Sequence, residues 1–92
     1  MKQKPALIWD TWNRKHIKKH NVSIVEAEEA YKNEIGRSES YEKRQSVFGI
    51  TKKDRPITVV VSYAKQEGPY VVSVRPMSKK ERSKYLYENQ KN

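Results

Sequence analysis

A run of β-branched residues, 57–64, constrains the fold of this chain more than any other stretch. Its three consecutive valines put branched side chains on both faces, which is typical of a central strand. Charged or glycine-containing turns at residues 52–56 and 66–69 bound the run, and strand-like segments lie beyond them at residues 44–50 and 70–75. We therefore expect three antiparallel strands joined as a meander.

Helix signals occupy the remaining parts of the chain. Asp10 is suited to cap a helix over residues 11–20, and Ser23 opens a capping box for a second helix over residues 24–33. Ser78 opens another capping box, for a closing helix that runs to about Glu88. An apolar run at residues 6–9 predicts a first strand, and residues 35–43 predict a loop or a weak edge strand.

The expected order is thus β-α-α-β-β-β-α, an α+β fold in which a helix pair packs on an antiparallel meander. The length of 92 residues indicates a single domain over residues 1–92. Residues 1–5 and 89–92 are expected to fray.

Composition narrows the class of partner. The chain has 20 Lys and Arg against 11 Asp and Glu, a net charge of +9, which favours nucleic acid, an anionic membrane or an acidic protein. It has no cysteine, which excludes disulfides, thiolate catalysis and cysteine zinc sites. No apolar run approaches the ~20 residues of a membrane span, so we expect a soluble, cytoplasmic protein that does not bind a membrane.

A candidate anion site lies where the last strand meets the closing helix. Arg75 follows an apolar strand and precedes Pro76, which restricts its backbone and fixes the direction of its side chain. The helix that begins after Ser78 offers backbone N–H groups, and an arginine of fixed direction can hold a phosphate with two hydrogen bonds. Arg44 starts an earlier strand and is a second candidate. The alternative is that both are solvated strand-end arginines.

The first helix carries the candidate proton-transfer groups. His16 and His20 lie four residues apart, so they share one face, and the cations around them include Lys18 and Lys19. Neighbouring positive charge disfavours a protonated imidazole, which leaves a histidine able to act as a general base. This role and a simple surface role remain equally open. No third ligand accompanies the pair, so neither a metal nor another cofactor is expected.

The closing helix is strongly basic. Its candidates for binding flanking phosphates are Lys79, Lys80 and Arg82, and the alternative is a solvated helix face. Tyr85 is better explained by packing on the sheet, with a phosphate or base contact as its second interpretation.

Taken together, these residues resemble the BrnT toxins, RelE-like ribonucleases of bacterial type II toxin–antitoxin pairs. Three groups carry the resemblance: Trp9, Asp10, Asn13, His16, Ile17, Lys19, His20, Val22, Glu26, Glu28 and Glu29; Arg44, Phe48 and Gly49; and Val74, Arg75, Pro76, Met77, Ser78, Glu81, Arg82 and Tyr85. Two residues depart from the family pattern, since Asn21 stands where many members have glycine and His16 where many have asparagine.

The resemblance implies a microbial-ribonuclease-like fold, metal-independent cleavage of messenger RNA and inhibition of translation. It also implies neutralisation by a ribbon–helix–helix antitoxin, in a complex that binds operator DNA and that dimerises through the antitoxin. In that hypothesis Arg75 and Arg44 stabilise the transition state, and His20, Lys19 or His16 moves protons. RNA contacts come from Lys18, Lys79, Lys80, Arg82 and Tyr85. The alternatives are a non-enzymatic nucleic-acid-binding module and an inactive toxin-like partner of a DNA-binding antitoxin.

Overall fold

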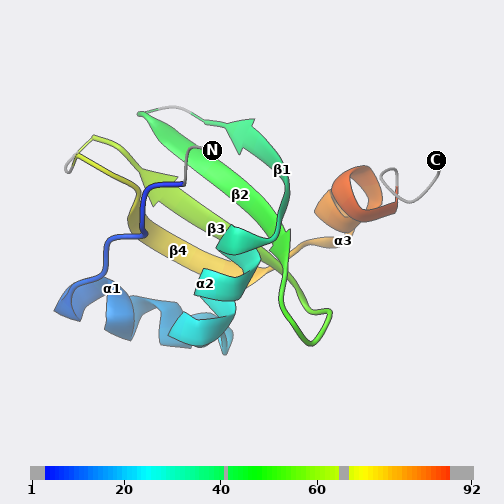
Figure 1. Cartoon of the computed structure of the whole chain (residues 1–92), viewed down its shortest axis with the longest axis horizontal. Helices are drawn as coiled ribbons and strands as arrows, with labels where there is room; N and C mark the ends of the chain where they lie inside the picture. Colours follow the sequence, from blue (N-terminus) through cyan, green and yellow to red (C-terminus); the bar gives the residue numbers. More distant parts are fainter. Residues whose placement is uncertain (1–3, 41, 65–66, 88–92) are drawn as a thin grey trace.

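A computed structural model describes residues 4–40, 42–64 and 67–87, and it forms a twisted sheet with helices on both sides (Figure 1). The elements in chain order are α1 (Thr11–His16), the 3₁₀-helix η1 (Ile17–His20), α2 (Ile24–Lys32), β1 (Glu34–Glu39), β2 (Arg44–Ile50), β3 (Pro56–Ser62), β4 (Tyr70–Pro76), α3 (Lys79–Glu81) and the π-helix η2 (Arg82–Tyr87). The α+β class and the meander packed by a helix pair are confirmed.

The sheet has four strands, in the order β1-β2-β3-β4, and every neighbouring pair is antiparallel. The β-branched run forms β3, which lies between β2 and β4 as a central strand should. Of the residues expected to form a loop or a weak edge strand, most belong to β1, which pairs with β2 from Glu34 to Glu39. The sequence did not predict this strand clearly, because a half-buried edge strand does not need alternating apolar residues and this segment is mostly polar.

The first predicted strand, at residues 6–9, is wrong. Ile8 makes only an isolated parallel bridge to Tyr70, at the outer edge of β4. The described chain therefore begins with helices, and four strands follow before the closing helix. Lys4 and Pro5 belong to the segment expected to fray, yet Lys4 pairs with Glu34 at 2.7 Å, and Pro5 accepts a hydrogen bond from the Tyr31 hydroxyl. Residues 1–3 and 89–92, and Glu88, lie outside the described part.

The helices α1, η1 and α2 cover one face of the sheet (Figure 1). Asp10 caps α1 and Ser23 caps α2, each through a reciprocal capping box with the residue three positions later. Asn21 closes η1 in the left-handed conformation, with φ of 56°. The predicted helix over residues 11–20 thus has the expected ends, but its last four residues tighten into the 3₁₀-helix.

The core lies between this helical layer and the sheet. Its buried members are Leu7, Ile17, Val22, Ala27, Ala30, Tyr31, Val47, Ile57, Val59, Val61, Val71 and Val74. Asn13 is fully buried, and its side-chain amide donates to the carbonyl oxygens of Ile8 and Val71 at 2.9 and 3.0 Å. These two bonds tie the first helix to the edge of β4 and satisfy a polar group that would otherwise be costly to bury.

The closing segment lies on the other side of the sheet (Figure 1). Ser78 caps α3 as predicted, and a π-helix follows instead of the regular helix that was expected. The Tyr85 ring stacks on Phe48 of β2, with ring centroids 4.2 Å apart. Gly36 makes room for this stack, since a Cβ there would lie 2.4 Å from the Tyr85 ring.

Candidate functional site on the open face of the sheet

The face of the sheet turned away from α1 and α2 carries a row of small side chains. We call this face the open face. Strand register aligns one residue from each strand directly across it: Ser38, Ser46, Val60 and Ser73. None of the four is fully buried, and three are serines. Three hydroxyl groups in one row can bond phosphate and ribose oxygens of an extended polymer.

The next row across the open face is covered by α3 and η2. It consists of Gly36, Phe48, Thr58 and Arg75. Tyr85 covers the β1–β2 end of this row, and Glu81 bonds both residues at the β3–β4 end. The closing segment therefore bounds one side of the serine row, with Arg75 at that boundary.

Arg75 is not a free cation, because it forms a two-pronged ion pair with Glu81. Its Nη1 and Nη2 donate to the two carboxylate oxygens at 2.7 and 2.8 Å. Glu81 also accepts from the Thr58 hydroxyl at 3.0 Å and from the Ser78 backbone N–H at 2.9 Å. The hydrogen bond from Arg75 is the main cause that lowers the pKa of Glu81 to about 2, so the carboxylate is ionised at neutral pH. The same capping box that starts α3 therefore fixes the arginine.

One edge of the Arg75 guanidinium stays unused. The two terminal nitrogens serve Glu81, and Nη1 also donates to the Pro76 carbonyl oxygen at 3.4 Å. Among the described residues nothing accepts from Nε–H or from the second Nη2 hydrogen. These two donors form the other bidentate edge of an arginine, and the side chain is 34% exposed. Arg75 can therefore bind a phosphate while it holds Glu81.

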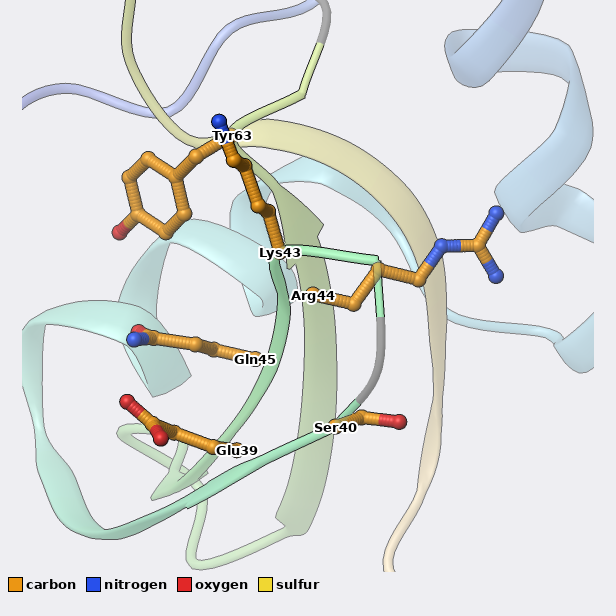
Figure 2. A pocket seen from close by; sticks show the side chains of 6 residues that line it. All are labelled: Glu39, Ser40, Lys43, Arg44, Gln45 and Tyr63. Atoms are coloured by element: carbon orange, nitrogen blue, oxygen red, sulfur yellow. The ribbon is translucent and has the colours of Figure 1, made fainter.

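Arg44 lies at the opposite side of the serine row. It pairs with Ser62 of β3, whereas Arg75 pairs with Thr58, four positions away along the same strand. That separation is about 13 Å along the strand at ~3.3 Å per residue, or about two nucleotides of extended RNA. Figure 2 shows the Arg44 side chain leaving the sheet on the side opposite to Gln45 and Tyr63. The two predicted arginines thus flank the same surface without touching.

The predicted proton-transfer residues belong to the helical layer. His16 is half-buried and stacks on Trp12, with ring centroids 4.5 Å apart and planes 14° apart. Lys18, Lys19 and His20 are exposed on η1, which packs beside β4. In the described part of the chain no hydrogen bond, ion pair or ring contact joins either histidine to Arg44 or Arg75. The structure therefore brings the arginines to one surface and leaves the histidines on another layer.

The basic residues of the closing segment differ in their exposure and in their hydrogen bonds. Lys79 and Lys80 are exposed at the start of α3, beside the Arg75–Glu81 pair in sequence and space. Arg82 donates to the Met77 carbonyl oxygen at 3.3 Å. Tyr85 is half-buried in its stack, which confirms packing on the sheet as its structural role.

A pocket that the sequence did not reveal lies at the Arg44 end of the sheet. It is shallow, about 320 Å³, and its lining residues are Glu39, Ser40, Lys43, Arg44, Gln45 and Tyr63. In Figure 2 the side chains of Glu39, Gln45 and Tyr63 point to the same side. Glu39 and Gln45 are cross-strand partners, but residues 35–43 were expected to form a loop or a weak edge strand of unknown register, so no sequence pattern joined the two.

Neither a metal cluster nor a membrane span is found among the described residues. No group of three or more His, Asp or Glu side chains is placed to hold a metal ion in residues 4–40, 42–64 and 67–87. No helix in these ranges is long and apolar enough to cross a membrane.

A polar sheet face with an arginine at each side, on a chain of net charge +9, has the features of a nucleic-acid-binding protein. The particular family follows from comparison with known proteins. The family model for the ribonuclease toxin BrnT of type II toxin–antitoxin systems matches residues 9–81, and the chain belongs to this family. No curated protein and no solved structure matches it. Membership implies an RNA substrate and a cognate antitoxin.

Proposed function

We propose that this ribonuclease toxin is an endoribonuclease that cleaves messenger RNA without a metal ion and so inhibits translation. Membership of the BrnT family supports the RNA substrate. The observation that carries the chemistry is the unused edge of Arg75, held in place beside the serine row by Glu81. A guanidinium that is held in a fixed position can stabilise negative charge that develops on a bound phosphate.

The reaction would be attack of a ribose 2′-OH on the adjacent phosphorus. The 2′ oxygen loses its proton to a base, the bond to the 5′ oxygen breaks, and that oxygen takes up a proton. The products are a 2′,3′-cyclic phosphate and a 5′-OH end. Arg75 would stabilise the negative charge that builds on the phosphorane-like transition state, a contribution typically worth about 3 kcal/mol. Arg44, on the opposite side of the serine row, would hold a second phosphate of the same RNA strand.

The proton-transfer groups would come from η1. His20 or Lys19 is the first choice, and His16 is the third, because His16 is already engaged with Trp12. Since η1 packs beside β4, the edge strand that carries Arg75, the scissile phosphate would have to lie at the β4 edge, between Arg75 and η1. Flanking phosphates would lie on Lys79, Lys80, Arg82 and Lys18, with Tyr85 at the border of the bound strand.

The partner would be a ribbon–helix–helix antitoxin that covers the active surface. The complex would dimerise through the antitoxin and bind operator DNA, and the toxin domain would be RelE-like and act in the cytoplasm, where its messenger substrate is found. Family membership supports the presence of a cognate antitoxin; its fold and its DNA binding are part of the proposal.

One observation favours a second function. Arg75 is neutralised by Glu81, and no described contact joins a histidine to either arginine. A non-enzymatic RNA-binding module would have the same features.

Incubation of the purified protein with RNA separates the two functions. We expect cleavage in the presence of EDTA, with fragments that carry 2′,3′-cyclic phosphate and 5′-OH ends. Binding without cleavage would support the non-enzymatic module, and cleavage that stops in EDTA would contradict the metal-independent mechanism.

A further inference from the structure

The pocket at the Arg44 end of the sheet combines hydrogen-bonding groups of fixed character. Gln45 accepts a hydrogen bond from Arg37 Nη1 on its Oε1 at 2.6 Å, and Arg37 is itself held by Glu34 at 2.8 and 2.9 Å. Because its oxygen is occupied, the Gln45 amide must direct its NH₂ group away from Arg37. Gln45 therefore presents a donor of defined direction.

Glu39 places hydrogen-bond acceptors beside the Gln45 donor. Its Cα pairs with that of Gln45 across β1 and β2, and both side chains point to the same side in Figure 2. The Glu39 carboxylate is exposed, and no described residue donates to it. Two acceptor oxygens thus stand next to one amide donor, at the ~5 Å spacing of paired strands.

Tyr63 gives the pocket an aromatic wall. Its side chain points to the same side as Gln45 in Figure 2, and it is half-buried. Its backbone N–H donates to the Lys43 carbonyl oxygen at 3.0 Å, which fixes the wall to the β1–β2 turn. Lys43 is exposed at the rim, where a phosphate could bind. A shallow pocket of about 320 Å³ with an aromatic side is large enough for one nucleobase and its ribose.

The order of donors and acceptors matches one base. The Watson–Crick edge of guanine presents two adjacent donors, N1–H and N2–H, followed by the acceptor O6. A carboxylate accepts from the two donors, and a neighbouring amide NH₂ donates to O6. Adenine and cytosine each place a ring-nitrogen acceptor beside one amino donor, and uracil has a single N–H between two carbonyl groups, so each would leave the carboxylate partly unpaired.

We propose that this pocket binds a guanine base of the RNA, with Glu39 on N1–H and N2–H, Gln45 on O6 and Tyr63 against the ring. The inference rests on the proposed function for its RNA context and extends it to sequence preference. Arg44 leaves the sheet on the other face at the same end. A strand whose guanine fills the pocket would therefore pass around this edge and bring a neighbouring phosphate to Arg44.

Binding of single nucleotides tests the pocket without any cleavage step. The probes are GMP, AMP, CMP and UMP, titrated into the ¹⁵N-labelled protein and followed by NMR. We expect GMP to bind about tenfold or more tightly than the other three, with shifts at the Gln45 side-chain amide and at Tyr63. Equal affinity for all four nucleotides, or no shift at these residues with GMP, would overturn the proposal.

The variant Glu39→Gln removes the acceptor pair and keeps the side-chain size. We expect it to reduce the preference for GMP to about twofold or less, while Glu67→Gln, an exposed carboxylate in the β3–β4 turn, leaves the preference unchanged. Undiminished preference in a folded Glu39→Gln protein would also overturn it.

A map of the cut sites then separates this proposal from the proposed function. The wild-type protein should cut at a fixed offset from G, and Glu39→Gln should cut with that preference abolished. If GMP binds as expected and RNA is never cut, the proposed function fails and the guanine pocket stands. If RNA is cut with no preference for G, the pocket proposal fails and the ribonuclease activity stands.

Discussion

Glu81 is the residue on which the local structure of the candidate site depends. Its carboxylate accepts from Arg75, Thr58 and the Ser78 backbone, and so joins β3, β4 and α3 in one network. The Glu81 carboxylate thus links three elements, and its ion pair helps to orient the arginine on the open face. The pKa of about 2 expresses how strongly the folded state prefers the ionised form.

Acid should weaken this network. In the unfolded chain Glu81 takes up a proton near its ordinary pKa of 4.5, whereas in the folded protein it remains ionised until about pH 2. Between these values the unfolded state binds more protons, so the free energy of unfolding falls as the pH falls. We expect Glu81→Gln to lower the free energy of unfolding by about 1–2 kcal/mol above pH 5, and the difference from wild type to vanish near pH 2.

Urea unfolding of both proteins at a series of pH values measures this difference. Comparison with the variant cancels the contributions of the other carboxylates, including Asp10 and Glu26, whose pKa values are also lowered. A difference that grows as the pH falls would contradict the role given to Glu81.

Gly49 permits the close approach of α2 to β2. A Cβ at this position would lie 1.8 Å from the Ala30 carbonyl oxygen, and neither backbone can move away without disturbing the core. We therefore expect Gly49→Ala to destabilise the protein by about 3 kcal/mol or more, as overpacking of a rigid contact does. At Gly68 the same change would meet only the end of the Ile8 side chain, at 3.1 Å, so Gly68→Ala is the matched control. Equal thermal stability of the two variants would show that the helix can yield.

The helix caps and three of the four strands could be predicted from the sequence, because each depends on residues that are close together in the chain. The caps at Asp10, Ser23 and Ser78 and the three β-branched or alternating strands are all present, because capping and burial leave a residue pattern. The strand β1 left no such pattern, since its partners are backbone groups of β2 and its side chains are mostly polar. The apolar run at residues 6–9 predicted a strand that does not form. Leu7 is apolar because it is buried in the core, but the segment pairs with the sheet at only one position.

An aromatic stack holds the π-helix η2 against the sheet. Tyr85 covers Phe48 over the space that Gly36 leaves open, and its ring makes the contact. We expect Tyr85→Ala to lower the free energy of unfolding by about 2–3 kcal/mol, because the burial and the stacking of the ring are removed, while Tyr85→Phe keeps nearly full stability. Chemical denaturation of the two variants measures this. A destabilisation of Tyr85→Phe as large as that of Tyr85→Ala would assign the contact to the hydroxyl group instead.

The two arginines of the candidate site could be predicted from the sequence, but the residues that contact them could not. Arg75 and Arg44 were chosen because each stands at the end of a strand, and strand order then placed them at two sides of one surface. The Arg75–Glu81 pair was missed although capping boxes were recognised, because the capping glutamate was assigned only a backbone partner. The pocket of Glu39, Gln45 and Tyr63 could not be predicted, since it joins three segments through a strand that the sequence did not reveal.

The distribution of positive charge predicts a salt-dependent affinity for RNA. A 2′-O-methyl oligonucleotide lacks the attacking hydroxyl and allows binding to be measured without cleavage. We expect log K to fall linearly with log salt, and the double variant Lys79→Ala/Lys80→Ala to reduce the slope by about 1.4, or ~0.7 for each phosphate that a lysine no longer binds. The exposed pair in the β2–β3 turn gives the control, Lys52→Ala/Lys53→Ala, whose slope should equal that of wild type. An equal reduction of the slope in both variants would indicate that RNA is attracted by the overall positive charge and does not bind along a defined surface.

In the proposed mechanism Arg75 stabilises the transition state of RNA cleavage, whereas Glu81 only holds Arg75 in position. Removal of Arg75 alone would strand a half-buried carboxylate and threaten the fold, so the informative comparison is Glu81→Gln against Arg75→Ala/Glu81→Gln. Both proteins lack the ion pair and differ only in the arginine. The measurement is the rate of formation of 2′,3′-cyclic phosphate ends on one RNA, with both variants shown to be folded. We predict that Glu81→Gln cleaves and that the double variant is slower by at least about 100-fold. Equal rates in the two folded variants would show that Arg75 does not stabilise the transition state.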